Sequence, residues 1–304
     1  MNYQSIIEKV AAQILAIENR GQVAQYIPEL REVDPRFFGV HLHSLQGGHF
    51  GVGDDSVRFS IQSISKVFSL ILAYNHLGAD LWKRVGVEPS GTPFNSLVQL
   101  EYDQGIPRNP MINAGAIVVC DVLLSAFQNP RLELLDFIRK VACTEDIAFN
   151  ETVAASEKAV GYRNTALVNL MKSFGNIEND IDEVLDFYFY MCAIEMTCAE
   201  LSCSFQFLAN DGCHPITGEE VLTLSRSKRV NAVMQTCGFY DEAGEFSFCV
   251  GLPGKSGVGG GIVAVHPEYF SIAVWSPRLN EKGNSYRGLR FLEQFTTATG
   301  LSVF

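Results

Sequence analysis

The spacing of apolar residues changes twice along the chain, and this change limits the possible folds more than any other feature. Residues 37–54, "FFGVHLHSLQGGHFGVGD", alternate on either side of Gln46-Gly47-Gly48, which predicts a β-hairpin. From Ser63 onward the spacing is helical through most of the middle of the chain. It returns to an alternation near residue 246. Strands at both ends of a helical middle predict an α+β fold, with one antiparallel sheet flanked by helices and a mainly helical second lobe.

The individual elements follow from the same spacing. We expect an N-terminal helix, a helix that begins at the capping box "TCAE" and further helices at 130–146, 156–176, 180–195 and 226–236. We expect three strands and a last helix at 246–252, 254–267, 269–277 and 286–299. With 304 residues, of which 47% are hydrophobic, the chain can bury a large core. We predict a single domain, 1–304, with an α/β lobe from about 1–62 plus 230–304 and a helical lobe from about 63–229.

The charge of the chain limits its partners. A formal net charge of -11 argues against nucleic acid or an anionic membrane surface as the main partner. Residues 1–21 lack the basic start and the cleavage site of a signal peptide. No run of about 18 uncharged apolar residues indicates a transmembrane helix. We therefore expect a cytoplasmic protein.

The cysteines and histidines do not indicate a metal site. The eight cysteines include no C-x-x-C pair, and most lie in apolar context, which predicts reduced, buried thiols. One loose cluster has a spacing that matches no usual zinc pattern: Cys198, Cys203, Cys213 and His214. His41 and His43 share a strand face, which we interpret as a polar outer face because no third ligand is evident. We predict neither a metal nor a cofactor.

The segment 59–74, "FSIQSISKVFSLILAY", contains a single charged residue, Lys66. A buried ammonium costs several kcal/mol unless it is paired or loses its proton, which suggests a chemical role. Ser63 lies three residues earlier on the same helix face, so the amine can reach its hydroxyl. Burial would lower the pKa of Lys66, and the helix start would stabilise negative charge on an attacked carbonyl. The alternative is that Ser63 only caps the helix while Lys66 extends to water.

A second serine–lysine pair with the same spacing serves as an internal comparison. Ser225 and Lys228 lie in the basic run "LSRSKRVN". A solvated lysine stays protonated and cannot act as a base. We interpret Ser225 as a helix N-cap.

Gly-Lys-Ser at 254–256 resembles the end of a phosphate-binding loop, but the required upstream glycine falls on Cys249 and a strand follows. The glycines also lack the order of a dinucleotide site. We interpret the segment as an edge strand whose small residues let a substrate lie against the backbone. A serine–lysine pair early in the chain and a Lys-Ser-Gly strand late in it resemble the framework of penicillin-binding proteins and serine β-lactamases, which implies acyl transfer through a serine ester.

Further blocks resemble the serine-dependent glutaminases in their bacterial form. They occur in order from about residue 20 to the C-terminus: "YIPEL" (26–30), "QSISK" (62–66), "EPSGTPFN" (88–95), "NPMINAGAI" (109–117), "SEKAVGYRN" (156–164), "LDFYF" (185–189), "CGFYDEAGEF" (237–246) and "LPGKSGVGGGI" (252–262). The resemblance implies a β-lactamase-like fold, hydrolysis of L-glutamine to L-glutamate and ammonia, no cofactor, and a homo-oligomer, either a tetramer or a dimer. The third β-lactamase motif, Ser-Asp-Asn, has no clear copy here, and the resemblance implies that a tyrosine fills its role.

The resemblance also implies site residues. Ser63 matches the nucleophile and Lys66 its partner. The substrate-contacting positions match Tyr26, Ser63, Asn113, Glu157, Asn164, Tyr188, Tyr240 and Val258. Glu157 suits the α-ammonium of glutamine, while asparagine and tyrosine donors suit the α-carboxylate. The N–H groups of Ser63 and Val258 would form the oxyanion hole. Tyr188 or Tyr240 could carry the proton, and Tyr240 is the choice nearer the leaving group.

Each of these residues has an ordinary structural alternative. Asn113 could cap or turn the backbone, Glu157 could be a first-turn helix acid, and Asn164 could be a solvated helix residue. Tyr188 could simply pack in the core. Two other functions compete at this level: a penicillin-recognising peptidase or β-lactamase, and a ligand-binding member of the fold without activity.

Overall fold

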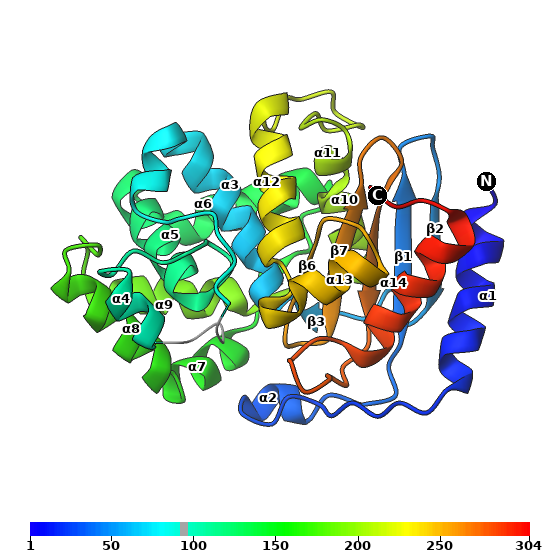
Figure 1. Cartoon of the computed structure of the whole chain (residues 1–304), viewed down its shortest axis with the longest axis horizontal. Coiled ribbons are helices and arrows are strands. Elements are labelled where there is room, and N and C mark those ends of the chain that lie inside the picture. The colour runs from blue at the N-terminus through cyan, green and yellow to red at the C-terminus, as the bar shows by residue number, and fades with distance from the viewer. Residues whose placement is uncertain (92–96) are drawn as a thin grey trace.

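The computed structural model describes residues 1–91 and 97–304, so part of the 88–95 block lies outside the described residues. Figure 1 shows a β-sheet with helices on its two faces, beside a second group of helices. The sheet is five-stranded and antiparallel, with the order β2-β1-β8-β7-β6. The predicted α+β architecture is confirmed at this level.

The sheet joins the two ends of the chain. β1 (Gly39–Ser44) and β2 (His49–Gly53) form the predicted hairpin. β1 also pairs with β8 (Phe270–Trp275), and β8 pairs with β7 (Gly261–His266). β6 (Gly254–Ser256) pairs only with β7 among the described strands and forms the predicted edge.

Different helices cover the two faces of the sheet. α1 (Tyr3–Ala16) and α14 (Tyr286–Thr299) pack on one face, where Val40 and Phe291 share a core. α10 (Cys198–Ser204) packs on the opposite face against β1 and β8, and it begins at the predicted capping box. Because side chains alternate along a strand, β1 contributes to both layers.

The second group of helices surrounds α3 (Ser65–Leu77), which contacts α5, α6 and α9. Its members are α4 (Leu97–Tyr102), α5 (Asn113–Ala126), α6 (Pro130–Ala142), α7 (Glu151–Ala159), α8 (Tyr162–Ser173) and α9 (Ile181–Cys192). Phe68, Leu70 and Ile71 of α3 are fully buried, and burying each such side chain contributes about 1.5–3 kcal/mol. In the part of the chain that the structure describes, no helix combines the length and apolarity needed to cross a membrane.

The remaining α-helices of the described residues are α2 (Pro28–Arg31), α11 (Gln206–Ala209), α12 (Leu224–Cys237) and α13 (Ala243–Cys249). A small second sheet has the order β3-β5-β4 and consists of β3 (Phe59–Ser60), β4 (Ala148–Phe149) and β5 (Ile194–Met196). The spacing of apolar residues does not reveal it, because two or three residues carry no measurable period. β3 leads directly into the segment that contains Ser63.

The strand predicted at 246–252 is wrong, because this segment forms most of α13 and the turn after it. Phe246 is buried and stacks on Phe239, whereas Phe248 is 91% exposed. The apparent alternation of these two phenylalanines therefore arises from a short helix with one buried face. A short apolar run fits either element equally well.

Three further predictions need correction. The strand predicted at 254–267 is two strands, β6 and β7, joined by a turn at 257–260. The helix predicted at 156–176 is two helices, α7 and α8, separated at Val160 and Gly161. Ser225 is not the N-cap of α12, since Thr223 accepts the capping hydrogen bond from the N–H of Arg226.

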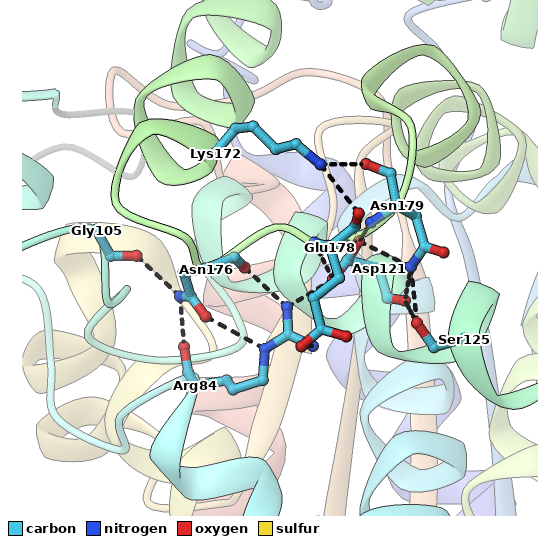
Figure 2. Close-up of polar contacts among 8 residues, drawn as sticks. All are labelled: Arg84, Gly105, Asp121, Ser125, Lys172, Asn176, Glu178 and Asn179. Carbon is cyan, nitrogen blue, oxygen red and sulfur yellow. Dashed lines mark hydrogen bonds and ion pairs between the residues drawn. The ribbon is translucent and has the colours of Figure 1, made fainter.

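A buried ion pair holds the connection between α8 and α9 against α5 (Figure 2). The Asp121 carboxylate is fully buried and lies 2.5 Å from Nη2 of Arg84. It also accepts hydrogen bonds from the backbone N–H groups of Glu178 and Asn179. The Asn176 side chain donates to the carbonyls of Arg84 and Gly105 at 2.9 Å. These contacts satisfy the buried charge and fix the loop.

Candidate active site

A pocket of about 330 Å³ contains every residue that the sequence assigns to substrate contact. It is lined by Tyr26, Ser63, Asn113, Glu157, Asn164, Tyr188, Tyr240 and Val258, together with Ile27, Gln62, Val160, Gly161, Arg163 and Cys192. These residues come from segments far apart in the sequence. Tyr26 is 57% exposed, whereas Ser63, Glu157 and Tyr188 are buried.

Lys66 is fully buried and does not extend to water. Its Nζ donates to Oδ1 of Asn113 at 2.7 Å and to the carbonyl of Met111 at 3.4 Å. Burial lowers the pKa of Lys66 to about 8, although the electrostatic influence of Cys192, Glu157 and Cys120 acts in the opposite direction. With such a pKa, about a tenth of the amines are neutral at pH 7 and can accept a proton.

Ser63 lies in a 3₁₀ turn, Gln62–Ile64, immediately before α3. Its side chain does not cap α3, because the start of that helix has no side-chain cap. The Tyr240 hydroxyl lies close enough to Ser63 and Ser256 for both side chains to influence its pKa. Burial, the largest influence, raises the pKa of Tyr240 to about 12, and the interactions with Ser63 and Ser256 oppose that shift.

Two pocket residues have a backbone conformation that favours glycine. Gln62 has φ 51° and Tyr240 has φ 55°. Each costs of order 1–3 kcal/mol and is retained only where the surrounding contacts impose it. Gln62 directly precedes Ser63 in the sequence, and the Tyr240 side chain interacts with Ser63.

Glu157 supplies a buried carboxylate to the pocket. Nε2 of Gln62 donates to its Oε1 at 2.8 Å and also to the Ser60 hydroxyl at 2.9 Å. Burial raises the pKa of Glu157 to about 7, against the hydrogen bond from Gln62 and the charge of Lys66. In its ionised form, the Glu157 carboxylate is only weakly solvated by water, so it can interact strongly with a bound cation.

Asn113 connects the lysine to the substrate side of the pocket. While its Oδ1 accepts from Lys66, its Nδ2 donates to Oδ1 of Asn164 at 3.0 Å. This arrangement fixes the amide orientation of Asn113, because a protonated amine can only donate. Asn164 is thus a bonded pocket residue and not a solvated helix position.

The turn at 257–260 carries Val258 to the pocket. A Cβ at Gly257 would lie 2.4 Å from the carbonyl oxygen of Ile61, and one at Gly259 would collide with the carbonyl oxygen of Ser60. The two glycines therefore let the turn pack against the backbone that precedes Ser63. We expected these small residues to admit a substrate, but their close neighbours are the protein's own main chain.

Sequence reasoning missed Lys255 as part of the site. It is fully buried, donates to the carbonyls of Gly238 at 2.9 Å and Ser256 at 2.7 Å, and lies 4.6 Å from the ring centroid of Tyr240. Burial, assisted by the charge of Lys66, holds the pKa of Lys255 well below its usual value. The signal was available, because Lys255 is also a single cation in an apolar segment.

The sequence analysis also did not identify Gln62 and Cys192 as pocket residues, because neither residue type by itself indicates a role in a site. The comparison pair behaves as expected: Ser225 and Lys228 are both exposed on α12. Within residues 1–91 and 97–304, the loose cluster of Cys198, Cys203, Cys213 and His214 does not form a group that could hold a metal ion.

The interpretation of His41 and His43 as a polar outer face is wrong. They do share a strand face, but His41 is buried and His43 hydrogen-bonds to Ser202 of α10 at 2.8 Å. A third histidine, His49, lies beside them.

Comparison with known proteins gives a consistent result over the whole chain. The family model described as Glutaminase matches residues 21–304. A glutaminase from Christiangramia forsetii is 57% identical over 304 residues, covering 100% of both chains. A solved structure of a probable glutaminase, ybaS, superposes with a TM-score of 0.93 at 34% identity, covering 99% of this chain and 97% of that chain. The structure of Mglu in its glutamate form gives a TM-score of 0.93 at 34% identity, covering 100% of this chain and 70% of that chain.

Proposed function

The chain belongs to the glutaminase family and hydrolyses glutamine to glutamate, and we propose that it does so through an acyl-enzyme formed on Ser63 with Lys66 as the proton acceptor. The observation that carries this mechanism is the fully buried Lys66, whose pKa is lowered to about 8, one helical turn after a pocket serine. A serine becomes a nucleophile only when a neighbouring base can take its proton.

In the first half-reaction the Ser63 oxygen attacks the side-chain carboxamide carbon of glutamine. Its proton passes toward neutral Lys66, and the N–H groups of Ser63 and Val258 stabilise the oxyanion. The carbon–nitrogen bond then breaks, and the nitrogen leaves as ammonia with the returned proton. In the second half-reaction water attacks the ester, glutamate is released and the Ser63 hydroxyl is restored.

Tyr240 is the better candidate for the proton relay. Its hydroxyl interacts with Ser63, and its ring centroid lies 4.6 Å from Nζ of Lys255. The Tyr188 hydroxyl instead interacts with Cys192, and its ring centroid lies 5.8 Å from Nζ of Lys66. We propose that Tyr188 shapes the pocket around the lysine while Tyr240 carries the proton.

The pocket also contains groups suited to the two ends of free glutamine. We propose that Glu157 binds the α-ammonium, and that Asn164 and a tyrosine hydroxyl donate to the α-carboxylate. Asn113 has its oxygen occupied by Lys66, so its contribution to substrate is through its Nδ2. Tyr26, at the exposed side of the pocket, would close over the substrate.

The mechanism is tested by ammonia release from glutamine. We expect Ser63→Ala to abolish turnover and Lys66→Ala to reduce it nearly as far, because the two residues act as one unit. The matched controls are Ser225→Ala and Lys228→Ala, a pair with the same spacing on the exposed face of α12, which should retain full activity. Near-normal turnover by Ser63→Ala would end the proposal.

We also propose the finer features that the resemblance implies. These are a β-lactamase-like fold, a division into lobes near 1–62 plus 230–304 and 63–229, a dimer or tetramer, and a cytoplasmic location. Within the second range, α10 packs on the sheet, which favours a lobe boundary nearer residue 197 than 229. Light scattering on the purified chain would measure its oligomeric state.

A further inference from the structure

Three histidines meet on one face of the β1–β2 hairpin, away from every residue of the pocket described above. His41 and His43 lie on β1, and His49 lies directly opposite His43 on β2. The imidazole nitrogens that these three side chains can offer lie within 4.8 Å of one another. Their ring centroids are 5.0, 5.3 and 5.4 Å apart. Among the described residues, no other group of histidine, cysteine and acidic side chains gathers in this way.

The hydrogen-bond partners define which ring nitrogens carry protons. Nδ1 of His41 lies 2.7 Å from a carboxylate oxygen of Asp55, which can only accept, so this nitrogen is the donor. Nδ1 of His43 lies 2.8 Å from the Ser202 hydroxyl, whose proton is donated to the carbonyl of Ala199. With Nδ1 as the donor in both rings, the Nε2 atoms of His41 and His43 are unprotonated and can act as metal ligands.

The surrounding chain is built to hold His41 in this orientation. Gly51 lies opposite His41 in the hairpin, and a Cβ there would collide with the Asp55 carboxylate and lie 2.8 Å from the His41 ring. The absent side chain is what lets Asp55 reach the imidazole. A carboxylate on the far nitrogen of a histidine is the usual support of a histidine that ligates a metal.

The three rings differ in burial: His41 is buried and His43 is partly buried. His49 is exposed, so the cluster can be reached from solvent. His41 is held by Asp55 and His43 by Ser202, and the exposed His49 completes the group of three possible ligands.

We propose that His41, His43 and His49 bind one divalent transition-metal ion of the kind that prefers imidazole nitrogen, with Zn²⁺ as the best fit. Nε2 of His41 and Nδ1 of His49 are 3.2 Å apart, close to the ~3.3 Å between two nitrogens on a tetrahedral zinc ion with bonds of about 2.0–2.1 Å. The ion replaces the hydrogen bond between these two nitrogens. His43 supplies the third ligand through Nε2, and water supplies the fourth.

The ion would connect β1 to β2 and so stabilise the hairpin. A ligand that binds only the folded chain raises its melting temperature in proportion to the logarithm of its concentration above Kd. This site is independent of the proposed mechanism, because no pocket residue takes part in it.

The test uses the full chain without an affinity tag, freed of metal by a chelator and kept reduced. We expect calorimetry with Zn²⁺ to give one equivalent per chain and a rise in Tm, whereas Mg²⁺ gives neither. Co²⁺ in place of Zn²⁺ should give the visible bands of nitrogen ligation without the near-ultraviolet band of thiolate ligation. A thiolate band, or more than one equivalent, would assign the metal to the cysteines and overturn the proposal.

Two variants locate the site. His49→Ala should lose the Zn²⁺ equivalent and the rise in Tm, and its fold should be unchanged because the side chain is exposed. Asp55→Asn keeps all three ligands and should weaken Zn²⁺ binding by about 10–100-fold through the lost support of His41. The matched control is His76→Ala, an exposed histidine on α3, which should bind as the unaltered chain does. Equal Zn²⁺ binding by His49→Ala and His76→Ala would show that the three histidines are only a packed cluster.

Discussion

At the scale of single residues, Lys66 serves two opposed requirements. The proposed chemistry at Ser63 needs a neutral amine, and burial favours one by lowering the pKa of Lys66 to about 8. Folding would be easier without the amine, because the unfolded chain solvates its charge freely. The buried amine therefore lowers the free energy of unfolding, and the rest of the core must compensate for this loss.

Removing this cost should stabilise the protein. We expect Lys66→Met to abolish turnover and to raise the free energy of unfolding by about 1–3 kcal/mol at pH 7, since an apolar side chain of similar length replaces a buried cation. Urea unfolding of both proteins measures the difference. A less stable Lys66→Met protein would show that the hydrogen bond to Asn113 more than compensates the buried charge.

The pH dependence of the reaction has a definite sign. Glu157 must be ionised to bind an ammonium group, and its pKa is about 7; Lys66 must be neutral to accept a proton, and its pKa is about 8. Both requirements are met as the pH rises, so kcat/KM for glutamine should increase between pH 6 and about 8.5. A profile that falls across this range would contradict both assignments.

Glu157 can be separated from Lys66 by substitution. Glu157→Gln keeps the hydrogen-bonding shape but loses the charge, so we expect kcat/KM to fall by about 100-fold, mainly through KM. The lower of the two ionisations should disappear from the pH profile. An unchanged KM would mean that another group binds the α-ammonium.

The residue types of the site were predictable, and their neighbours were not. The sequence indicates Ser63 and Lys66 because a single charge in an apolar segment is conspicuous, and the structure buries Lys66 and places Ser63 in the pocket. Lys255 is the same kind of signal, and it is buried. Its burial was not predicted, because Gly-Lys-Ser at 254–256 was compared with a phosphate-binding loop. Gln62 could not be identified, because only its backbone conformation and its contact with Glu157 distinguish it.

At the scale of elements, the turn between β6 and β7 carries Val258, one of the two proposed oxyanion donors, to the pocket. Gly259 lies against the carbonyl of Ser60, so a methyl group there would push the turn away from the segment that carries Ser63. We expect Gly259→Ala to lower kcat at least tenfold with a small effect on KM, because an oxyanion contact acts mainly in the transition state.

The control for this change is Gly244→Ala on α13, where a Cβ would meet no atom within 4 Å. It should leave kcat unchanged and, as a glycine-to-alanine change in a helix, should not lower Tm. Equal losses of kcat in both variants would indicate a general loss of folded protein.

The buried ion pair of α5 gives a second prediction at this scale. Asp121→Ala should destabilise the protein by about 3–5 kcal/mol, because it leaves Arg84 and two backbone N–H groups without their buried acceptor (Figure 2). The control is Asp80→Ala, which breaks the exposed pair with Lys83 and should cost at most about 1 kcal/mol. Urea unfolding measures both.

The Asp121 carboxylate should also make the stability of the protein depend on pH. Its hydrogen bonds and the charge of Arg84 hold the pKa of Asp121 below its usual value, against the effect of burial. Its contribution to stability is therefore complete above the ordinary aspartate pKa and is lost as the pH falls through the lowered value. The acid transition of Asp121→Ala should accordingly be shallower than that of the unaltered chain.

The prediction of helices and strands succeeded where a segment contains several repeats of one apolar spacing, and it failed where a segment has only a few residues. The hairpin at 37–54 and the helix at 286–299 were predicted correctly because each carries several repeats of one spacing. α13 was mistaken for a strand, and β3, β4 and β5 were not found, because their few residues fit more than one period.

At the scale of the whole molecule, the α+β class followed from the order of the segments, but the order of strands did not. Nothing in the hydrophobic pattern states that β1 lies between β2 and β8. That placement depends on packing between residues far apart in the chain. It puts the N-terminal hairpin on one sheet with the strand that carries Lys255, and the pocket lies beside that sheet.

The pairing of β1 with β8 has a consequence for biosynthesis. β1 leaves the ribosome early, yet its partner Phe270–Trp275 is translated only near the end of the chain. At about 5–20 residues per second, the edge of β1 waits on the order of tens of seconds for that partner. Throughout this interval the hairpin of a nascent polypeptide has one strand edge without its partner, and Val40 and Leu42 lack their final packing; such exposed segments are prone to aggregate.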